Sequence, residues 1–490
     1  MSTHRQILKS IGIIGSSKVV TILIGIVRTK VIAILLGPLG IGIAGILQST
    51  VDLIASLTHF GIEFSAVRDV AESAETKDKA SIAKAITVLR RWSWFTGVLG
   101  MIITAIFCRR LSIIGFGNES YASGIAILSV TILISSISSG QMALLQGVRQ
   151  LGAIAKSNIH GVVIGFVITV PLYYRYGLAG IIPALFVSPI VSLCISWWYA
   201  RKVYVEKVKI SFADTVKGGI GMIKLGSFMV LSTFMLTGTM YLIRIIITSK
   251  ADVDVVGQFQ AVWTLSSVYL MTVINTMSVD YYPRLAGVNS DNKAVNLLVN
   301  EQMEITLLVS VPLIVIMLSF APELINLFYS KSFIGATTIL EWQLVGDFFK
   351  IIFFPIAYVL LAKGEGGYFI VSEFIGGASY LLFTYFGWGV FGKESIGMSY
   401  LFSRALYMFV VLLFVGIITG FRINKKVLRY IILCGVVVLL GFLNSYVVEG
   451  YKRYVFSSVL VLFSIMYSIY EINKIIDVLS FINGKIMKNQ

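Results

Sequence analysis

The stretch VVTILIGIVRTKVIAILLG, residues 19–37, is an apolar run long enough to cross a membrane as a helix. Arg28 and Lys30 interrupt it. A charge near the middle of a transmembrane helix costs about 2.5–3.5 kcal/mol on insertion scales, so it usually marks a path for a substrate or an ion. On a helix Lys18 and Arg28 lie about 80° apart and can share a face, whereas Lys30 points about 160° away from Arg28. We therefore expect Lys18 and Arg28 to bind a ligand and Lys30 to anchor the helix at the membrane surface.

The composition of the whole chain agrees with a membrane location. Hydrophobic residues make up 57% and charged residues 13% of the chain, and the mean hydropathy is +0.88. Since a soluble domain has about 25% charged residues, the chain is predicted to be a polytopic membrane protein. The net charge of +16 lies mostly in short loops, without a basic patch and interleaved aromatic residues, so no nucleic-acid partner is expected. The three cysteines are isolated and form no CxxC motif, so no metal site is expected, and no cofactor either.

Apolar runs of about 20 residues recur along the chain and predict an all-α protein with about fourteen transmembrane helices. They are expected near 9–36, 41–65, 87–107, 120–145, 154–174, 178–200, 222–248, 255–281, 303–321, 336–362, 367–388, 396–420, 428–448 and 454–472. The longest loops on the side richer in Lys and Arg are 66–86, 201–221 and 282–302. The positive-inside rule places these loops and both termini in the cytoplasm.

An internal repeat supports a division into two halves. A shift of 216 residues superposes Arg28 on Arg244 and Arg68 on Arg284, and each pair lies at the same place in its half. We therefore predict two pseudo-symmetric six-helix lobes followed by two further helices. The predicted division is an N-lobe at 1–200, a cytoplasmic linker at 201–221, a C-lobe at 222–420, and two C-terminal helices with a cytoplasmic tail at 421–490.

The second predicted helix carries a polar stripe. Gln48, Asp52, His59 and Glu63 fall within about 60° of one another on a helix. Four costly residues on one face indicate a wet cavity, although Gln48 and Glu63 alone could also be interfacial.

A second group of charged residues lies in the predicted C-lobe. Gln343, Asp347 and Lys350 are spaced i, i+4 and i+7, so Asp347 and Lys350 can pair. This pair is either a switch or a structural ion pair between helices. Glu373 and Arg404 are further isolated charges in apolar runs.

These charges suggest the class of ligand. A cavity lined by Arg and Lys suits a substrate that carries pyrophosphate or carboxylate, and the acids and His59 can load and release protons. Motifs of catalysis such as HExxH, GxSxG in a strand–turn–helix context and the P-loop are absent from the sequence. A transporter of an anion is therefore expected rather than an enzyme.

Three motifs resemble one family. LGPLGIGIAGILQSTVDLIASLTHFGIEFSAVRDVAE (36–72) and WQLVGDFFKIIFFPIAYVLLAKGEGGYFIVSE (342–373) are similar to stretches of the Wzx-type flippases of O-antigen and enterobacterial common antigen, and YYPRL (281–285) is common in their superfamily. The resemblance implies the MOP exporter fold, in which two six-helix bundles face a central cavity. It also implies alternating-access transport of undecaprenyl-diphosphate-linked oligosaccharide from the inner to the outer leaflet of the bacterial cytoplasmic membrane. The two C-terminal helices are a departure from twelve-helix relatives.

We assign roles on this basis as hypotheses. The substrate is bound by Lys18, Arg28, Arg244 and Arg404, of which the first three contact its diphosphate or an anionic sugar, and the path in the N-lobe is lined by Asp52, His59 and Glu63. The switching pair is formed by Asp347 and Lys350, with Glu373 as a further coupling residue. The inner mouth holds Arg68 and Arg284, which either recruit the head group or simply follow the positive-inside rule.

Three alternatives remain open on the sequence alone. A MATE-type antiporter and a lipid II flippase would share the fold, while a membrane polysaccharide polymerase or ligase belongs to another class. The expected partners are the lipid-linked oligosaccharide and membrane lipids, with H+ or Na+ as candidate coupling ions and a polysaccharide polymerase and chain-length machinery as candidate protein partners.

Overall fold

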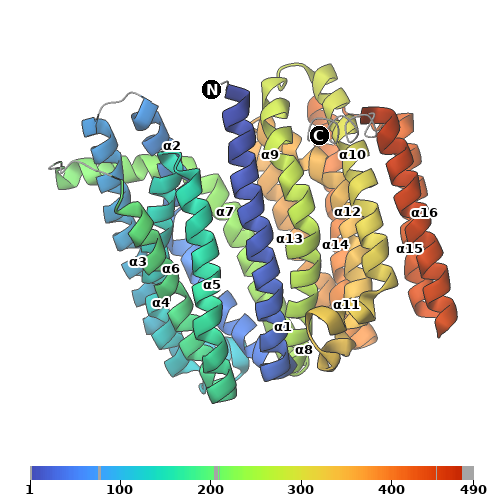
Figure 1. Cartoon of the computed structure of the whole chain (residues 1–490), viewed down its shortest axis with the longest axis horizontal. Coiled ribbons are helices and arrows are strands. Elements are labelled where there is room, and N and C mark those ends of the chain that lie inside the picture. The colour runs from blue at the N-terminus through green and yellow to red at the C-terminus, as the bar shows by residue number, and fades with distance from the viewer. Residues whose placement is uncertain (1–2, 76–78, 204–207, 209, 448–449, 477–490) are drawn as a thin grey trace, which may run out of the picture. The chain divides into compact units, whose positions relative to one another are not determined.

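The computed structural model describes residues 3–75, 79–203, 208, 210–447 and 450–476. Every regular element in these residues is a helix (Figure 1), so the all-α prediction is confirmed. The chain forms two compact units. Unit 1 is residues 1–257 with 328–330, and unit 2 is residues 258–327 with 331–490.

Unit 1 contains the first seven helices and the beginning of the eighth. They are α1 (Thr3–Thr58), α2 (Ile62–Glu75), α3 (Lys79–Phe116), α4 (Ala122–Gly147), α5 (Leu151–Tyr176), α6 (Ile181–Ala200), α7 (Phe212–Lys250) and α8 (Val253–Trp263), with a 3-10 turn at Gly177–Gly180. Within the unit, α4 packs between α3 and α6, while α1 packs against α5 and α7.

Unit 2 begins at the end of α8 with a π-helical segment, Thr264–Leu270. Its helices are α9 (Met271–Gly287), α10 (Asn292–Ser319), α11 (Ala321–Phe328), α12 (Thr337–Ala362), α13 (Gly366–Phe391), α14 (Ser395–Thr419), α15 (Lys425–Val447) and α16 (Tyr451–Ile476), with 3-10 turns at Lys331–Ala336 and Gly392–Glu394. α12 lies at the centre of this unit, against α10, α14 and α15. The two C-terminal helices both pack on α10.

The predicted helices at 9–36 and 41–65 are parts of one kinked element, α1. Gly37 has a φ of 64° and precedes Pro38, which explains the kink. The second part ends at Thr58, because Phe60 and Gly61 have φ values of 50° and 67° and turn the chain into α2. The prediction of one continuous helix over 41–65 is therefore wrong at its C-terminal end.

The three long predicted loops are largely helical. Residues 66–86 belong mostly to α2 and α3, α9 and α10 cover most of 282–302, and α7 begins within 201–221. The Ser211 hydroxyl caps α7 by accepting from the Asp214 amide, and Asp291 caps α10. An apolar run in the sequence covers only the part of a helix that lies in the hydrocarbon core of the membrane. The polar ends of these helices were therefore predicted as loops.

The two compact units divide after residue 257 and not at the predicted linker 201–221. The reason is that α7 packs against α1 and α3 in unit 1. Its first turn is held by Trp92, whose Nε1 donates to the Thr215 carbonyl at 2.9 Å, and by Arg91, which donates to the Thr215 hydroxyl at 2.6 Å. The division into two pseudo-symmetric six-helix lobes stays a prediction.

Ten stretches of the described residues are long and apolar enough to cross a membrane. Three of them, Ser17–Thr58, Leu151–Ala200 and Gly366–Thr419, are long enough for two consecutive spans, and each contains a kink or a 3-10 turn. The chain is thus a multi-pass membrane protein, and the count of fourteen spans stays a prediction.

Candidate functional site

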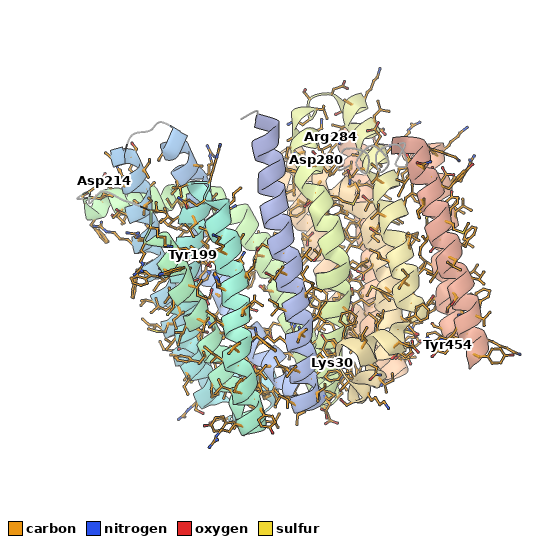
Figure 2. The ribbon with its side chains drawn as sticks, viewed as in Figure 1. Lys30, Tyr199, Asp214, Asp280, Arg284 and Tyr454 are labelled. Atoms are coloured by element: carbon orange, nitrogen blue, oxygen red, sulfur yellow. The ribbon has the colours of Figure 1, made fainter. Side chains whose placement is uncertain are left out.

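Arg28 lies in the first part of α1 and turns toward α5 and α6. Its Nη2 donates to the Ser188 hydroxyl at 3.4 Å, and the guanidinium also interacts with the Tyr173 hydroxyl. Lys18 is exposed on the same helix. Lys30 lies near the other end of this part of α1 (Figure 2), where an anchoring role was expected. Arg28 is thus positioned by neutral hydroxyl groups, which leave its charge available to an anion.

Asp52 and Arg244 face each other from α1 and α7. Asp52 accepts a hydrogen bond from Gln48 Nε2 at 2.8 Å and interacts electrostatically with Arg244. One turn away, Thr237 of α7 donates to the Ser56 hydroxyl of α1 at 3.0 Å. These residues join the predicted stripe of α1 to polar side chains of α7 in a polar seam within unit 1.

The two arginines predicted to lie in facing lobes are both in unit 1. Arg28 contacts α5 and α6, whereas Arg244 is buried on α7 and also donates to the Met240 carbonyl at 2.9 Å. Both arginines therefore belong to one compact unit, because α7 packs on α1, and their placement in facing lobes stays a prediction. Their role in substrate binding stays a prediction.

The bend between α1 and α2 separates the predicted four-residue stripe into two pairs. His59 Nδ1 lies 3.4 Å from Glu63 Oε1 across the bend. Phe60 between them has a positive φ, which is unfavourable for a bulky side chain and is found most often where a local arrangement is imposed by the fold. Arg68 follows on α2 and is exposed.

Asp347 lies at the centre of unit 2 and is fully buried. One of its carboxylate oxygens accepts from the Tyr400 hydroxyl at 2.9 Å, and the other accepts from Ser266 in the π-helical segment. Ser266 in turn accepts from Gln343 Nε2 at 2.8 Å. Both oxygens of the carboxylate are thus held by hydroxyl groups from two other helical elements.

Three more charges surround Asp347. Lys350 interacts electrostatically with Asp347, with Glu373 and with Arg404. The Arg404 guanidinium lies over the ring of Tyr400, 4.8 Å from its centroid. With two acids and two cations the cluster is formally neutral, which lowers the cost of burying each member. We call Asp347, Lys350, Glu373 and Arg404 the buried charge cluster, after Asp347, which is fully buried; the other three are partly buried.

Two tyrosines of α14 connect this cluster. Tyr400 donates to Asp347, and Tyr407 donates to Glu373 Oε1 at 2.7 Å. Each ring lies in a notch, since a Cβ on Gly346 would come within 2.6 Å of Tyr400 and one on Gly376 within 2.7 Å of Tyr407. The missing glycine side chains therefore let the tyrosines reach the acids.

The structure groups Arg404 with the coupling candidates rather than with the predicted substrate-binding residues. Asp347 and Lys350 interact as predicted, although the hydrogen bonds of Asp347 come from hydroxyl groups. Sequence reasoning missed the two tyrosines. Their spacing, Tyr400, Arg404 and Tyr407 at i, i+4 and i+7, placed them on one face and was the available signal.

Arg284 forms an exposed ion pair near the end of α9. Its Nη1 lies 3.3 Å from Asp280 Oδ2 (Figure 2). Such an exposed pair contributes little to stability. Its role at the inner mouth stays a prediction.

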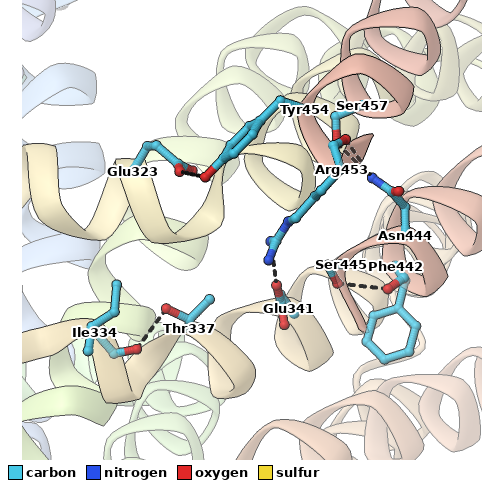
Figure 3. Close-up of polar contacts among 10 residues, drawn as sticks. All are labelled: Glu323, Ile334, Thr337, Glu341, Phe442, Asn444, Ser445, Arg453, Tyr454 and Ser457. Atoms are coloured by element: carbon cyan, nitrogen blue, oxygen red, sulfur yellow. Dashed lines mark hydrogen bonds and ion pairs between the residues drawn. The ribbon is translucent and has the colours of Figure 1, made fainter. Parts of the chain in front are cut away.

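A second buried ion pair of unit 2 was not predicted. Arg453 Nη2 at the start of α16 lies 3.2 Å from Glu341 Oε1 of α12, and the Glu341 side chain is 3% exposed (Figure 3). Tyr454 donates to Glu323 of α11, and Asn444 of α15 donates to the Ser457 hydroxyl at 2.9 Å. These contacts attach the two C-terminal helices to the rest of the unit.

The sequence of this chain matches a known protein family and two flippases. Residues 31–338 match the model of a family described as polysaccharide biosynthesis protein. The lipid III flippases of Escherichia coli K12 and Shigella flexneri are each 23% identical over 372 residues, which cover 73% of this chain and 86% of those proteins.

Solved structures show the same fold. An inward-facing multidrug resistance MATE transporter of the MOP superfamily matches with a TM-score of 0.68 at 14% identity, over 82% of this chain and 94% of that one. The lipid II flippase MurJ in an inward closed conformation matches with a TM-score of 0.64 at 14% identity, over 95% and 99%. The MOP-type fold expected from the sequence resemblance is therefore confirmed.

Proposed function

Because the chain belongs to the polysaccharide biosynthesis protein family, we propose that it is a flippase that moves lipid-linked oligosaccharides across the bacterial inner membrane. The observation that carries this proposal is the similarity to two lipid III flippases over 73% of the chain. The relatives are flippases and transporters, so a polymerase or ligase is disfavoured. The likeness to MATE transporters concerns the fold alone, since the identity is 14%.

The substrate proposed in detail is an undecaprenyl-diphosphate-linked O-antigen unit or a related one. Two features of unit 1 support an anionic head group. Arg28 is held by hydroxyl groups rather than by an acid, and a buried Arg244 lies in a membrane-spanning helix. A guanidinium presents several N–H donors to a phosphate and stays charged at any physiological pH.

Coupling to H+ or Na+ is proposed to take place at the buried charge cluster. Its carboxylates, Asp347 and Glu373, each accept from a tyrosine hydroxyl and lie within the field of Lys350 and Arg404. Binding of a cation by either acid would leave the cluster with a net positive charge inside the membrane, which is costly. A change in ion occupancy can therefore drive a change in conformation. Both termini are proposed to be cytoplasmic, and a polysaccharide polymerase is proposed to use the product.

A flipping assay in liposomes tests the function directly. Liposomes that contain defined lipid-linked glycans are assayed with the wild-type protein, Arg28→Gln and Lys30→Gln, with and without a proton gradient. Lys30→Gln is the matched control, because it removes the same charge two residues away on another face of the helix. We expect Arg28→Gln to abolish flipping and Lys30→Gln to retain it. Flipping by Arg28→Gln at the wild-type rate would contradict the proposed role of Arg28. A wild-type protein that does not flip the lipid-linked glycan would contradict the proposed function.

A further inference from the structure

A pocket in unit 1 lies apart from the residues described so far. It is a cavity of about 260 Å³ at the beginning of α3 and the ends of α4 and α6. The side chains that matter are Arg90, Ser93, Trp94, Gln141, Trp197 and Arg201. All three helices begin or end here, so the pocket lies near one surface of the membrane. Tyr199, close to the end of α6, marks this region in Figure 2.

The charge of this pocket is positive. Arg90 and Arg201 are both exposed, and none of the described residues that line the pocket is acidic. Neither arginine forms an ion pair with an acid in the part of the chain that the structure describes. Arg201 instead lies over the ring of Trp197, 4.9 Å from its centroid. Two guanidinium groups at one cavity favour an anion with several oxygens, such as a phosphate.

Gln141 adds a neutral donor to the two arginines. Its Oε1 accepts from the Ser196 hydroxyl at 2.6 Å, which fixes the orientation of the amide. The amide nitrogen is then the group that can donate into the pocket.

The tryptophans place the pocket at the depth of the lipid head groups. Trp94 is 55% and Trp197 is 53% exposed, although both lie in membrane-spanning stretches. Exposed tryptophans of membrane proteins gather at the boundary between lipid and water. Lys202, which follows α6, lies 4.0 Å from the ring centroid of Trp198 and adds a third cation at this level.

We propose that this pocket binds the phosphate head group of an anionic phospholipid of the surrounding membrane. Basic pockets between transmembrane helices are a recurrent way to bind such head groups. The volume is below the roughly 300–1,000 Å³ of sites that enclose a whole drug-sized ligand. The head group therefore enters the pocket while the acyl chains stay in the bilayer. This site does not depend on the proposed flippase function.

Binding of phosphatidylglycerol to the purified full-length protein in detergent tests the proposal. Native mass spectrometry compares the wild type with Arg90→Gln, Arg201→Gln and the double variant. We expect affinity to fall about fivefold for each arginine and about 25-fold for the double variant. Arg109→Gln/Arg110→Gln is the matched control, because these two arginines are exposed near the opposite end of α3 and should not alter binding.

Three results would overturn the proposal. The first is unchanged phosphatidylglycerol affinity in the double Gln variant or in Arg90→Lys/Arg201→Lys. The Lys variant keeps the charge but loses the bidentate geometry, so it is expected to bind more weakly than wild type. The second is equal affinity for phosphatidylethanolamine. The third is inorganic phosphate displacing the lipid at equal concentration, which would make this a site for a free anion. Flipping of the lipid-linked glycan in liposomes without anionic phospholipid should be the same in the double variant and the wild type.

Discussion

Neutralising Asp347 tests whether the Asp347–Lys350 pair acts as a switch or only as a structural ion pair. Asp347→Asn keeps the shape of the side chain and leaves one acid, Glu373, against Lys350 and Arg404. The cluster would then carry a net charge of about +1 inside the membrane, which costs about 2.5–3.5 kcal/mol. The hydrogen bonds are nearly retained, because the amide can still accept from one hydroxyl and donate to the other. We expect the free energy of unfolding to fall by about this amount.

The double variant Asp347→Asn/Lys350→Met restores the charge balance. Replacing a buried ion pair by neutral groups of similar size is often neutral or stabilising. We therefore expect the double variant to regain most of the lost stability, as measured by unfolding of the purified protein in detergent. If the pair is a switch, flipping in liposomes stays lost in the double variant, and if it only holds helices together, flipping returns.

The second buried pair of unit 2 supplies a matched control. Glu341→Gln should lower the free energy of unfolding, because it leaves Arg453 unpaired, and Glu341→Gln/Arg453→Met should regain it. Flipping should be retained in the variant that is as stable as wild type.

An Asp347→Asn protein as stable as wild type would refute the reasoning about the charge cluster. A double variant of the charge cluster that flips at the wild-type rate would refute the switch.

Two further substitutions test how unit 1 and unit 2 are built. Gly257→Ala should destabilise the folded protein by about 1–3 kcal/mol or prevent folding, because its Cβ would lie 1.9 Å from the Pro38 carbonyl oxygen. Gly287→Ala is the control and should be tolerated, because no atom lies within 4 Å of its Cβ. The unfolding midpoints and yields of the two variants test this expectation. Tyr407→Phe removes the donor to Glu373 and should cost about 1.5–3 kcal/mol, and an unfolding curve superimposable on that of wild type would contradict the proposed contact.

The sequence predicted the class of the fold because membrane insertion leaves a simple record. Long apolar runs and the placement of Lys and Arg identified a multi-pass helical protein, and the motifs at 36–72 and 342–373 resembled the right superfamily. The position at which the two compact units divide could not be read from the sequence, for a physical reason. α7 begins within the predicted linker 201–221 and packs on α1, and no one-dimensional pattern shows which helices touch.

The candidate site was predicted in its charges but not in its hydroxyl groups. Asp347, Lys350 and Glu373 stood out because a charge in an apolar run is costly. Tyr400 and Tyr407 did not stand out, since tyrosine is common in membrane helices and its hydroxyl becomes informative only once the partner is known. The notches at the glycines that seat these rings can be recognised only in three dimensions.

The charges of the two units differ in a way that divides the proposed chemistry. The described membrane spans of unit 1 hold Arg28 beside hydroxyl groups and Arg244 with Asp52, whereas the buried cluster of unit 2 balances two acids with two cations. An excess of cations suits the binding of an anionic substrate, and a balanced cluster suits the exchange of one cation. We therefore expect Arg244→Gln to raise the substrate concentration needed for half-maximal flipping at an unchanged response to a proton gradient. Glu373→Gln should do the reverse, and equal effects of both variants on both measurements would contradict the division.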